Sequence, residues 1–286
     1  MSGSTGSAEP KACERGSTVS LRLTSVNSQV QFKCGTAVAK LYPDDDGELA
    51  CLNSDCTTTT TIKDLVALKK PNGNYALTLQ HAPQEPRTIY FNCYKEPVVG
   101  VSGAEELGPS EPTEFCVVQV SLLAVLKKPS QEVRICSKGT ETLSFDITET
   151  SKNALFACGE NGTLSPPLLD HTFKDPSSTE QSRLSDMLET AQLVESGGTE
   201  TSPIYTFSVS KLPKAVTNVY YKCIYGDGTG EHKSGKHECK VALKVDAAAS
   251  TSSDGTSWAS PDMKGQQFFA GVVALCLSTL ASLHVV

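Results

Sequence analysis

Cysteines recur at matching positions in the two halves of this chain, and this repetition constrains the fold more than any other feature. Two cysteine motifs of the first half reappear in the second: Val30–Gly35 (VQFKCG) as Ala154–Gly159 (ALFACG), and Ile89–Cys93 (IYFNC) as Val219–Cys223 (VYYKC). The first two cysteines of each half lie 21 and 22 positions apart. Parallel spacing of this kind predicts two tandem domains that descend from one.

The length of the chain agrees with this division, because 286 residues exceed one ordinary domain. We place the first domain at residues 12–127 and the second at residues 134–245. The connection between them falls near Lys127–Gln131.

The number of cysteines indicates the compartment in which the protein folds. The chain has 11 cysteines, and one of them, Cys276, lies in an apolar C-terminal segment, which leaves ten at wide spacing. An even set of this kind favours disulfides formed in an oxidising compartment. Zinc is disfavoured, because the one close pair, Cys51 and Cys56, has no second pair of comparable spacing. We therefore expect an exported protein with no metal and no cofactor.

Apolar and polar residues alternate along many segments, which is the period of a half-buried strand. Val19–Leu23 shows this pattern in the first half, and Leu143–Ile147 shows it in the second. The cysteines fall on the apolar phase, so they would point inward and tie one sheet to the other. The predicted fold class is all-β, with two disulfide-bonded β-sandwich domains.

Two segments depart from the alternation and are predicted to form short helices at the edges of the sandwiches. They are residues 62–70 and residues 178–194. In the second segment, a Ser178/Gln181 capping box precedes residues at helical spacing, namely Leu184, Met187, Leu188 and Ala191.

Taken together, these motifs resemble the SRS family of surface antigens from Toxoplasma and related coccidian parasites. The shared features are two tandem β-sandwich domains, F-x-C-G on an early strand, Y-x-x-C on a later one, x-C-x-V-x-V on the last, and a terminal anchor signal. In that family the first cysteine pairs with the sixth, the second with the fifth and the third with the fourth. The resemblance implies five disulfides: Cys13–Cys116, Cys34–Cys93, Cys51–Cys56, Cys136–Cys239 and Cys158–Cys223.

The resemblance also implies attachment to host cells and display to host antibodies, and not catalysis. Some members of the family form homodimers and present a basic groove to sulfated glycosaminoglycans, which are the partners implied here. Because this chain has a formal net charge of −7, only local patches could attract a polyanion. Lys69–Lys70 and Lys127–Lys128 are small patches. The leading candidate residues for glycan binding are His232, Lys233, Lys236 and His237.

Two other functions stay open: a ligandless coat or immune decoy and, more distantly, an enzyme tethered to the surface. The sequence contains no G-x-S-x-G, H-E-x-x-H or G-x-G-x-x-G motif that would support catalysis. The acidic run Asp44–Glu48 lacks the spaced ligands of a calcium loop, so a solvated turn is favoured. The negative net charge argues against nucleic-acid binding.

The C-terminal segment Phe268–Val286 is almost wholly apolar, and no basic residue follows it. A polar spacer and a cluster of small residues precede it, which is the order of a glycosylphosphatidylinositol (GPI) anchor signal. We expect residues 246–257 to form a stalk and residues 258–286 to be removed. The lipid would be attached at Ser253, Asp254 or Gly255 and would hold the protein in the outer leaflet of the plasma membrane. The alternative is an apolar helix that is retained as a tail anchor.

Two further expectations concern export. Met1–Pro10 is small and polar without an apolar leader, so the leader was either trimmed from this sequence or lost through a misassigned start. The sequon Asn161-Gly162-Thr163 makes Asn161 a candidate for N-glycosylation in the secretory pathway.

Attachment of the anchor near Ser253–Gly255 would remove Trp258, the one tryptophan, and Cys276 from the mature protein. Mass spectrometry of the mature protein should therefore find neither residue, and phosphatidylinositol-specific phospholipase C should release the protein from cells. Detection of Trp258 in the mature chain would support the retained helix instead.

Overall fold

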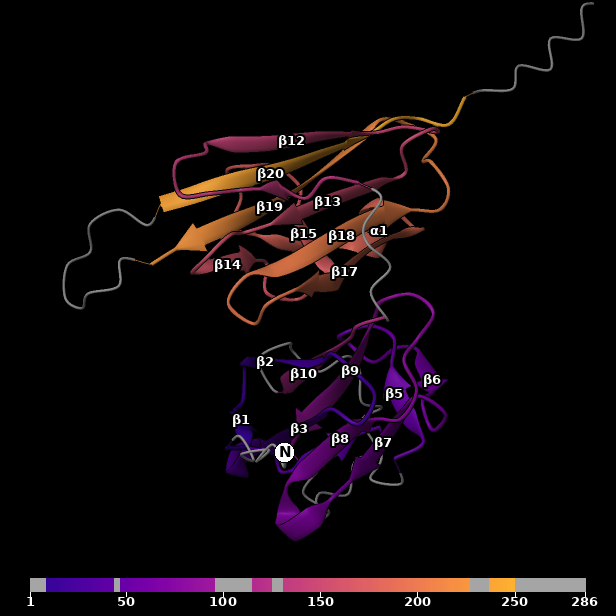
Figure 1. The fold of residues 1–286 in the computed structure, drawn as a ribbon, viewed down its shortest axis with the longest axis vertical. Helices are drawn as coiled ribbons and strands as arrows, with labels where there is room; N and C mark the ends of the chain where they lie inside the picture. The colour runs from indigo at the N-terminus through magenta and orange to yellow at the C-terminus, as the bar shows by residue number, and fades with distance from the viewer. Residues whose placement is uncertain (1–8, 44–46, 96–114, 125–130, 227–236, 250–286) are drawn as a thin grey trace, which may run out of the picture. The chain divides into compact units, whose positions relative to one another are not determined.

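The structure is a computed structural model that describes residues 9–43, 47–95, 115–124, 131–226 and 237–249 (Figure 1). These residues belong to one compact unit, Met1–Ala249. Within this unit, the described residues up to 124 form the first β domain and those from 131 form the second.

The first domain contains two sheets. One has the strand order β1-β3-β8-β7, formed by Lys11–Cys13, Gln29–Cys34, Tyr75–Leu79 and Val66–Lys69. The other has the order β2-β10-β9-β5-β6, formed by Thr18–Leu23, Cys116–Leu122, Arg87–Tyr94, Leu49–Cys51 and Thr59–Thr61. A further strand, β4 (Lys40–Tyr42), also pairs with β9.

The second domain repeats this topology strand for strand. Its first sheet has the order β11-β13-β18-β17, formed by Arg134–Ile135, Asn153–Ala157, Pro203–Val209 and Ala191–Gly198. Its second sheet has the order β12-β20-β19-β15-β16, formed by Thr142–Ile147, His237–Val245, Thr217–Tyr225, His171–Phe173 and Gln181–Arg183. β14 (Gly162–Ser165) pairs with β19, as β4 does with β9. Because the two domains have the same strand order, the structure confirms the prediction of two tandem all-β domains.

Each domain has an apolar core that its two sheets enclose. In the first domain, the rings of Phe32 and Tyr75 stack with their centroids 5.1 Å apart. In the second domain, Phe156 lies 5.6 Å from Tyr205 and 6.2 Å from Tyr221 between ring centroids. The alternation in the sequence arises because each strand turns one face to the opposite sheet and the other away from it.

Four disulfides join the two sheets of a domain at equivalent places. Cys13–Cys116 and Cys34–Cys93 do so in the first domain, and Cys136–Cys239 and Cys158–Cys223 do so in the second. The fifth disulfide, Cys51–Cys56, closes a short loop. These are the pairs that the family resemblance implies. Apart from Cys34, which is partly exposed, the cysteines that join the sheets are fully buried, as the alternation predicts.

The prediction of a helix at residues 62–70 is wrong. The backbone makes one turn after Ile62, where the amide of Val66 donates to the Ile62 carbonyl, and then enters β7. Val66 and Leu68 are buried while Lys69 is exposed, which is the period of a strand. Pairing of β7 with β8 therefore determines the conformation of this segment.

A helix was predicted at residues 178–194, but the structure has only a single helical turn there, α1 (Leu184–Met187). Leu184 and Leu188 are both buried at helical spacing, which explains the signal in the sequence. Gln181 belongs to β16, so the Ser178/Gln181 capping box does not form, and the residues from Ala191 onward pair with β18. Two 3-10 turns, η1 (Thr36–Val38) and η2 (Pro71–Gly73), lie in the first domain.

In the part of the chain that the structure describes, every helix is too short or too polar to cross a bilayer.

Replacing both cysteines of Cys13–Cys116, or of Cys136–Cys239, with Ala should lower the free energy of unfolding by about 4 kcal/mol, because each bridge has a sequence separation of 103. Replacing Cys51 and Cys56 should lower it by about 2 kcal/mol, since their separation is 5. Denaturant unfolding measures both effects. Equal losses for the long and the short loop would contradict the argument from loop length.

Candidate functional site at the junction of the two domains

The predicted glycan-binding residues lie mostly outside the described part of the chain. Of these residues, His237 is described as the exposed first residue of β20, and it pairs with Tyr225 of β19. The residues that lie outside are His232, Lys233, Lys236, Lys127–Lys128, and the candidates for anchor attachment Ser253, Asp254 and Gly255. The structure therefore leaves the basic patch and the anchor as expectations from the sequence.

The structure does describe the candidate glycosylation site and one of the small lysine patches. Asn161 is exposed in the turn between β13 and β14, with a φ of 60°, a left-handed conformation that Asn tolerates. Lys69 is exposed at the end of β7, and the Nζ atom of Lys70 lies 4.7 Å from the centroid of the Tyr75 ring. The Lys69–Lys70 pair belongs to the first domain and His237 to the second.

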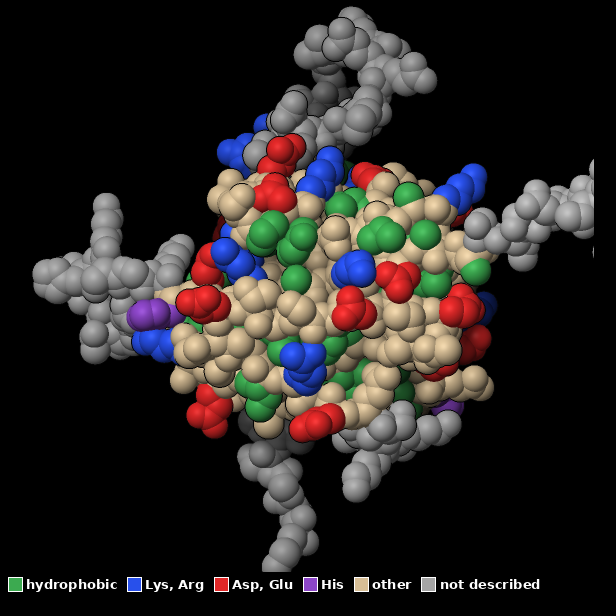
Figure 2. All heavy atoms as spheres, turned by 90° about the horizontal axis from the view of Figure 1, so that it is seen from above, with side chains coloured by type: hydrophobic (Ala, Val, Ile, Leu, Met, Phe, Trp, Pro, Cys, Tyr) green, Lys and Arg blue, Asp and Glu red, His purple; other side chains and the backbone are tan. Residues whose placement is uncertain are grey.

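Charges of opposite sign are mixed on the described surface. Figure 2 shows Lys and Arg side chains interspersed with Asp and Glu on the face drawn there. In the second domain, Lys244 lies between Asp146 at 4.0 Å and Asp246 at 3.6 Å. Such mixing cancels the field at a distance, so these lysines offer a sulfated chain no concentrated positive charge.

Strand β10 and residues Ile89–Cys93 of β9 are buried on both faces, which the sequence did not predict. All seven residues of β10 are buried, whereas the equivalent strand β20 alternates between buried and more exposed residues. The second domain covers the outward face of β10. The sequence does contain a signal: the outward residues Val117, Gln119 and Ser121 are uncharged, whereas the equivalent positions in β20 are Lys240, Ala242 and Lys244.

Gln119 connects this face to the loop that follows β14. Its side-chain nitrogen donates to the Pro167 carbonyl at 3.3 Å, and its side-chain oxygen accepts from the Leu169 amide at 2.8 Å. Beside it, Tyr90 and Val117 pack with Leu168 in a small apolar cluster. Both the polar and the apolar groups of the face therefore have partners in the second domain.

Asp170 forms the next connection. Its Oδ2 atom accepts from the Ser54 amide at 2.7 Å, and its Oδ1 atom lies 2.8 Å from Nδ1 of His171. Burial acts to raise the pKa of Asp170, but the hydrogen bonds and charge of His171 and the hydrogen bonds of Ser54 outweigh it and lower the pKa. The carboxylate therefore stays ionised at the junction. Arg183 and Asp55 form an ion pair nearby.

Arg22 of β2 forms an ion pair with Glu195 of β17, and both side chains are largely buried. The guanidinium of Arg22 also donates to the carbonyls of Gly197 at 3.0 Å and Gly198 at 3.2 Å. The pairing register of β17 with β18 shifts between Glu195 and Gly197. A shift of this kind changes the direction in which nearby side chains point. Burial raises the pKa of Glu195 more than the Arg22 charge lowers it.

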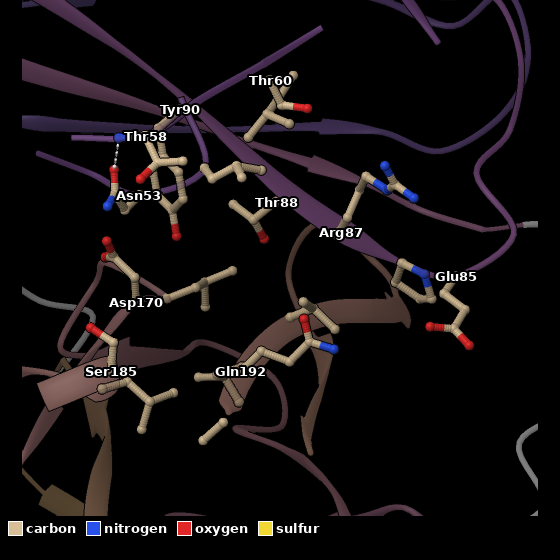
Figure 3. A pocket seen from close by; sticks show the side chains of 18 of the residues that line it. Asn53, Thr58, Thr60, Glu85, Arg87, Thr88, Tyr90, Asp170, Ser185 and Gln192 are labelled. Atoms are coloured by element: carbon tan, nitrogen blue, oxygen red, sulfur yellow. Dashed lines mark hydrogen bonds between the residues drawn. The ribbon is translucent and has the colours of Figure 1, made fainter. Parts of the chain in front are cut away.

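A cleft of about 450 Å³, here called the interdomain cleft, lies beside these contacts (Figure 3). One wall consists of first-domain residues between Leu52 and Tyr90, and the other of second-domain residues between Leu169 and Val194. The side chains of Thr88 and Tyr90 point into it from β9, and Gln192 faces them from β17 (Figure 3). The junction thus combines ionic and hydrogen-bonded contacts with an open space that polar and apolar side chains line together.

Replacing Asp170 with Asn should destabilise the protein at neutral pH and have little effect in acid. The lowered pKa of Asp170 means that its carboxylate stabilises the folded state above the unfolded pKa of about 3.9, and that this contribution is lost as the pH falls through the folded pKa. The gap in Tm between wild type and Asp170→Asn should therefore be widest above about pH 5 and shrink below about pH 4.

Asp64→Asn is the matched control, because Asp64 is an exposed aspartate of the first domain. Thermal unfolding of the three proteins across this pH range measures the gap. A gap that stays constant with pH would mean that the charge of Asp170 does not stabilise the junction.

Comparison with known proteins identifies the family. The model of the SAG family, an SRS domain, matches residues 7–122 and 132–245. The structure of SporoSAG from Toxoplasma gondii is similar, with 22% identity, a TM-score of 0.34 and coverage of 83% of this chain and 100% of that chain. A cadmium-bound structure of SporoSAG has 21% identity, a TM-score of 0.33 and the same coverage.

The Plasmodium falciparum protein Pf12p is similar at 10% identity, with a TM-score of 0.27 and coverage of 81% of this chain and 98% of that chain. Comparison with the curated proteins finds no match. Because the family model spans both tandem domains, the chain belongs to the SRS-domain family of surface antigens.

Proposed function

We propose that this protein attaches the parasite surface to host cells by binding sulfated glycans, and that host antibodies recognise it there. The observation that carries the proposal is the match of the SRS-domain family to both domains. The basic residues of the segment 232–237 supply the charge that a sulfated chain requires, which the mixed surface described above does not.

The position of His237, the described end of this segment, supports the proposal. Tyr225 and His237 pair at one end of β19 and β20, so the segment between them starts and finishes at that end of the sheet. β20 then runs for nine residues to Val245, which places its far end about 26 Å away at the usual rise per residue. Residues 246–257 continue from this far end. A lipid attached at Ser253, Asp254 or Gly255 would therefore follow, in the chain, the end of β20 that lies opposite to His237.

A second candidate function, an inert coat or decoy, is favoured by the position of Asn161. Gly162, the next residue of the sequon, pairs with Tyr225, and Tyr225 pairs with His237. An N-glycan on the exposed Asn161 would therefore project near His237, the described end of the basic segment, and shield it from a large ligand. Removal of this glycan should strengthen binding if the protein is an adhesin, and should change nothing if it is a coat.

Replacing Lys233 and Lys236 with Ser should abolish most binding of the protein to heparin, because the two lysines concentrate positive charge on an otherwise acidic chain. Binding by the wild type should also fall steeply as salt is added, since the screening length is about 8 Å at physiological ionic strength. Surface plasmon resonance at several salt concentrations measures both effects.

The matched control is the double variant Lys211→Ser and Lys214→Ser. These two lysines are exposed, belong to the same domain and have the same spacing in the sequence. Unchanged heparin binding after loss of Lys233 and Lys236, or equal loss in the control, would exclude the basic segment as the glycan site.

A further inference from the structure

We propose that the interdomain cleft is a second binding site, which takes a small neutral ligand rich in hydroxyl groups, such as one or two hexose units. This site is separate from the basic segment of the proposed function and differs from it in chemistry. Its volume of about 450 Å³ falls within the range of ordinary ligand pockets. Both domains contribute walls, so an occupant would contact residues that are far apart in the sequence.

The first step of the argument concerns Thr88. Its side chain lies at the centre of the cleft and points into it from β9 (Figure 3). Its Oγ1 atom is buried, and no group in the described part of the chain forms a hydrogen bond with it. Folded proteins rarely leave a buried hydroxyl without a partner. Thr88 therefore carries an unused donor and acceptor at the wall of the cleft, and a rotation of its side chain would present them to a ligand.

Other polar groups surround Thr88 on both walls. Tyr90 lies next to it on the same wall, and the amide of Gln192 lies on the opposite wall (Figure 3). Burial, and then the negative charge of Asp170, raise the pKa of Tyr90 well above its usual value, so its hydroxyl keeps its proton. The backbone of Asp170 already forms a hydrogen bond with this hydroxyl. The groups of the cleft that can both donate to and accept from a ligand are therefore the hydroxyl of Thr88 and the amide of Gln192. A ligand that carries several hydroxyl groups matches this set, because each hydroxyl also does both.

The charges around the cleft favour a neutral ligand. The charged residues that line it are two basic and two acidic, namely Arg87, Arg183, Glu85 and Asp170. Arg183 already pairs with Asp55, and Asp170 already accepts from Ser54 and contacts His171. A sulfated chain would gain little from this balanced set, whereas a neutral sugar would lose little in entering it.

Apolar side chains complete the lining. Leu65 of the first wall and Leu169 and Leu184 of the second lie among the polar groups. The C–H faces of a sugar ring are apolar, so they could pack against these leucines while the hydroxyls bind Thr88 and Gln192. A mainly apolar lining with a few polar groups that fix orientation is common in small-molecule sites.

Titration of the purified protein with neutral methyl glycosides of galactose, mannose and N-acetylglucosamine tests the proposal by saturation-transfer NMR. We expect at least one to bind, and we expect Thr88→Val and Gln192→Ala each to weaken that binding about tenfold, the effect of losing one good hydrogen bond. Thr142→Val is the control, because Thr142 is an exposed strand residue on β12, and it should bind as the wild type does.

Three outcomes would overturn the proposal: none of the glycosides binds, binding survives in both cleft variants, or heparin displaces the neutral glycoside. Gln192 is exposed, so Gln192→Ala remains informative if Thr88→Val does not fold. Lys233→Ser with Lys236→Ser should leave neutral-sugar binding unchanged. This variant therefore distinguishes a failure of the proposal for the cleft from a failure of the proposal for the basic segment.

Discussion

Burial of strand β10 and most of strand β9 on both faces is the constraint on which the rest of the structure depends. On the inner face, Cys93 and Cys116 tie these strands to the opposite sheet through disulfides. On the outer face, Tyr90 and Gln119 meet the second domain. Because both faces are buried along β10 and along Ile89–Cys93 of β9, these strands hold the core of the first domain and the junction together. Arg87, Thr88 and Tyr90 of β9 also line the interdomain cleft.

The two domains share one topology but use their outer sheets differently. In the first domain, the outward residues of β10 are uncharged and can be buried against a partner at small desolvation cost. In the second domain, Lys240 and Lys244 occupy the equivalent places and pair with acidic neighbours in solvent. The two domains therefore share one fold. The polarity of a few outward positions on β10 and β20 determines which of the two equivalent sheet faces is buried in the junction.

The charge pattern separates the two proposed sites. A basic segment in the connection from β19 to β20 suits a polyanion, because attraction between opposite charges acts at a distance and does not require close complementarity of shape. The interdomain cleft has balanced charge and hydroxyl groups at short range, which suits a small neutral ligand held by hydrogen bonds and contact. One SRS-domain protein could in this way bind two classes of ligand without competition between them.

The sequence by itself determined the two tandem all-β domains, because the period-two alternation and the repeated cysteine motifs are local patterns that backbone geometry imposes. The disulfide pairs came from the family resemblance that those motifs carry. Helical spacing at Leu184 and Leu188 was a true local signal, but pairing of the flanking residues with β15 and β18 limited it to one turn.

Only the tertiary structure decided where the junction and the cleft lie. Some of their contacts join residues more than 100 positions apart, such as Ser54 with Asp170 and Arg22 with Gly197, and the contact of Gln119 with Pro167 spans 48. The alternation along β10 shows which side chains point outward, but not what they meet, because the partner surface is set by long-range packing and not by the period of the strand.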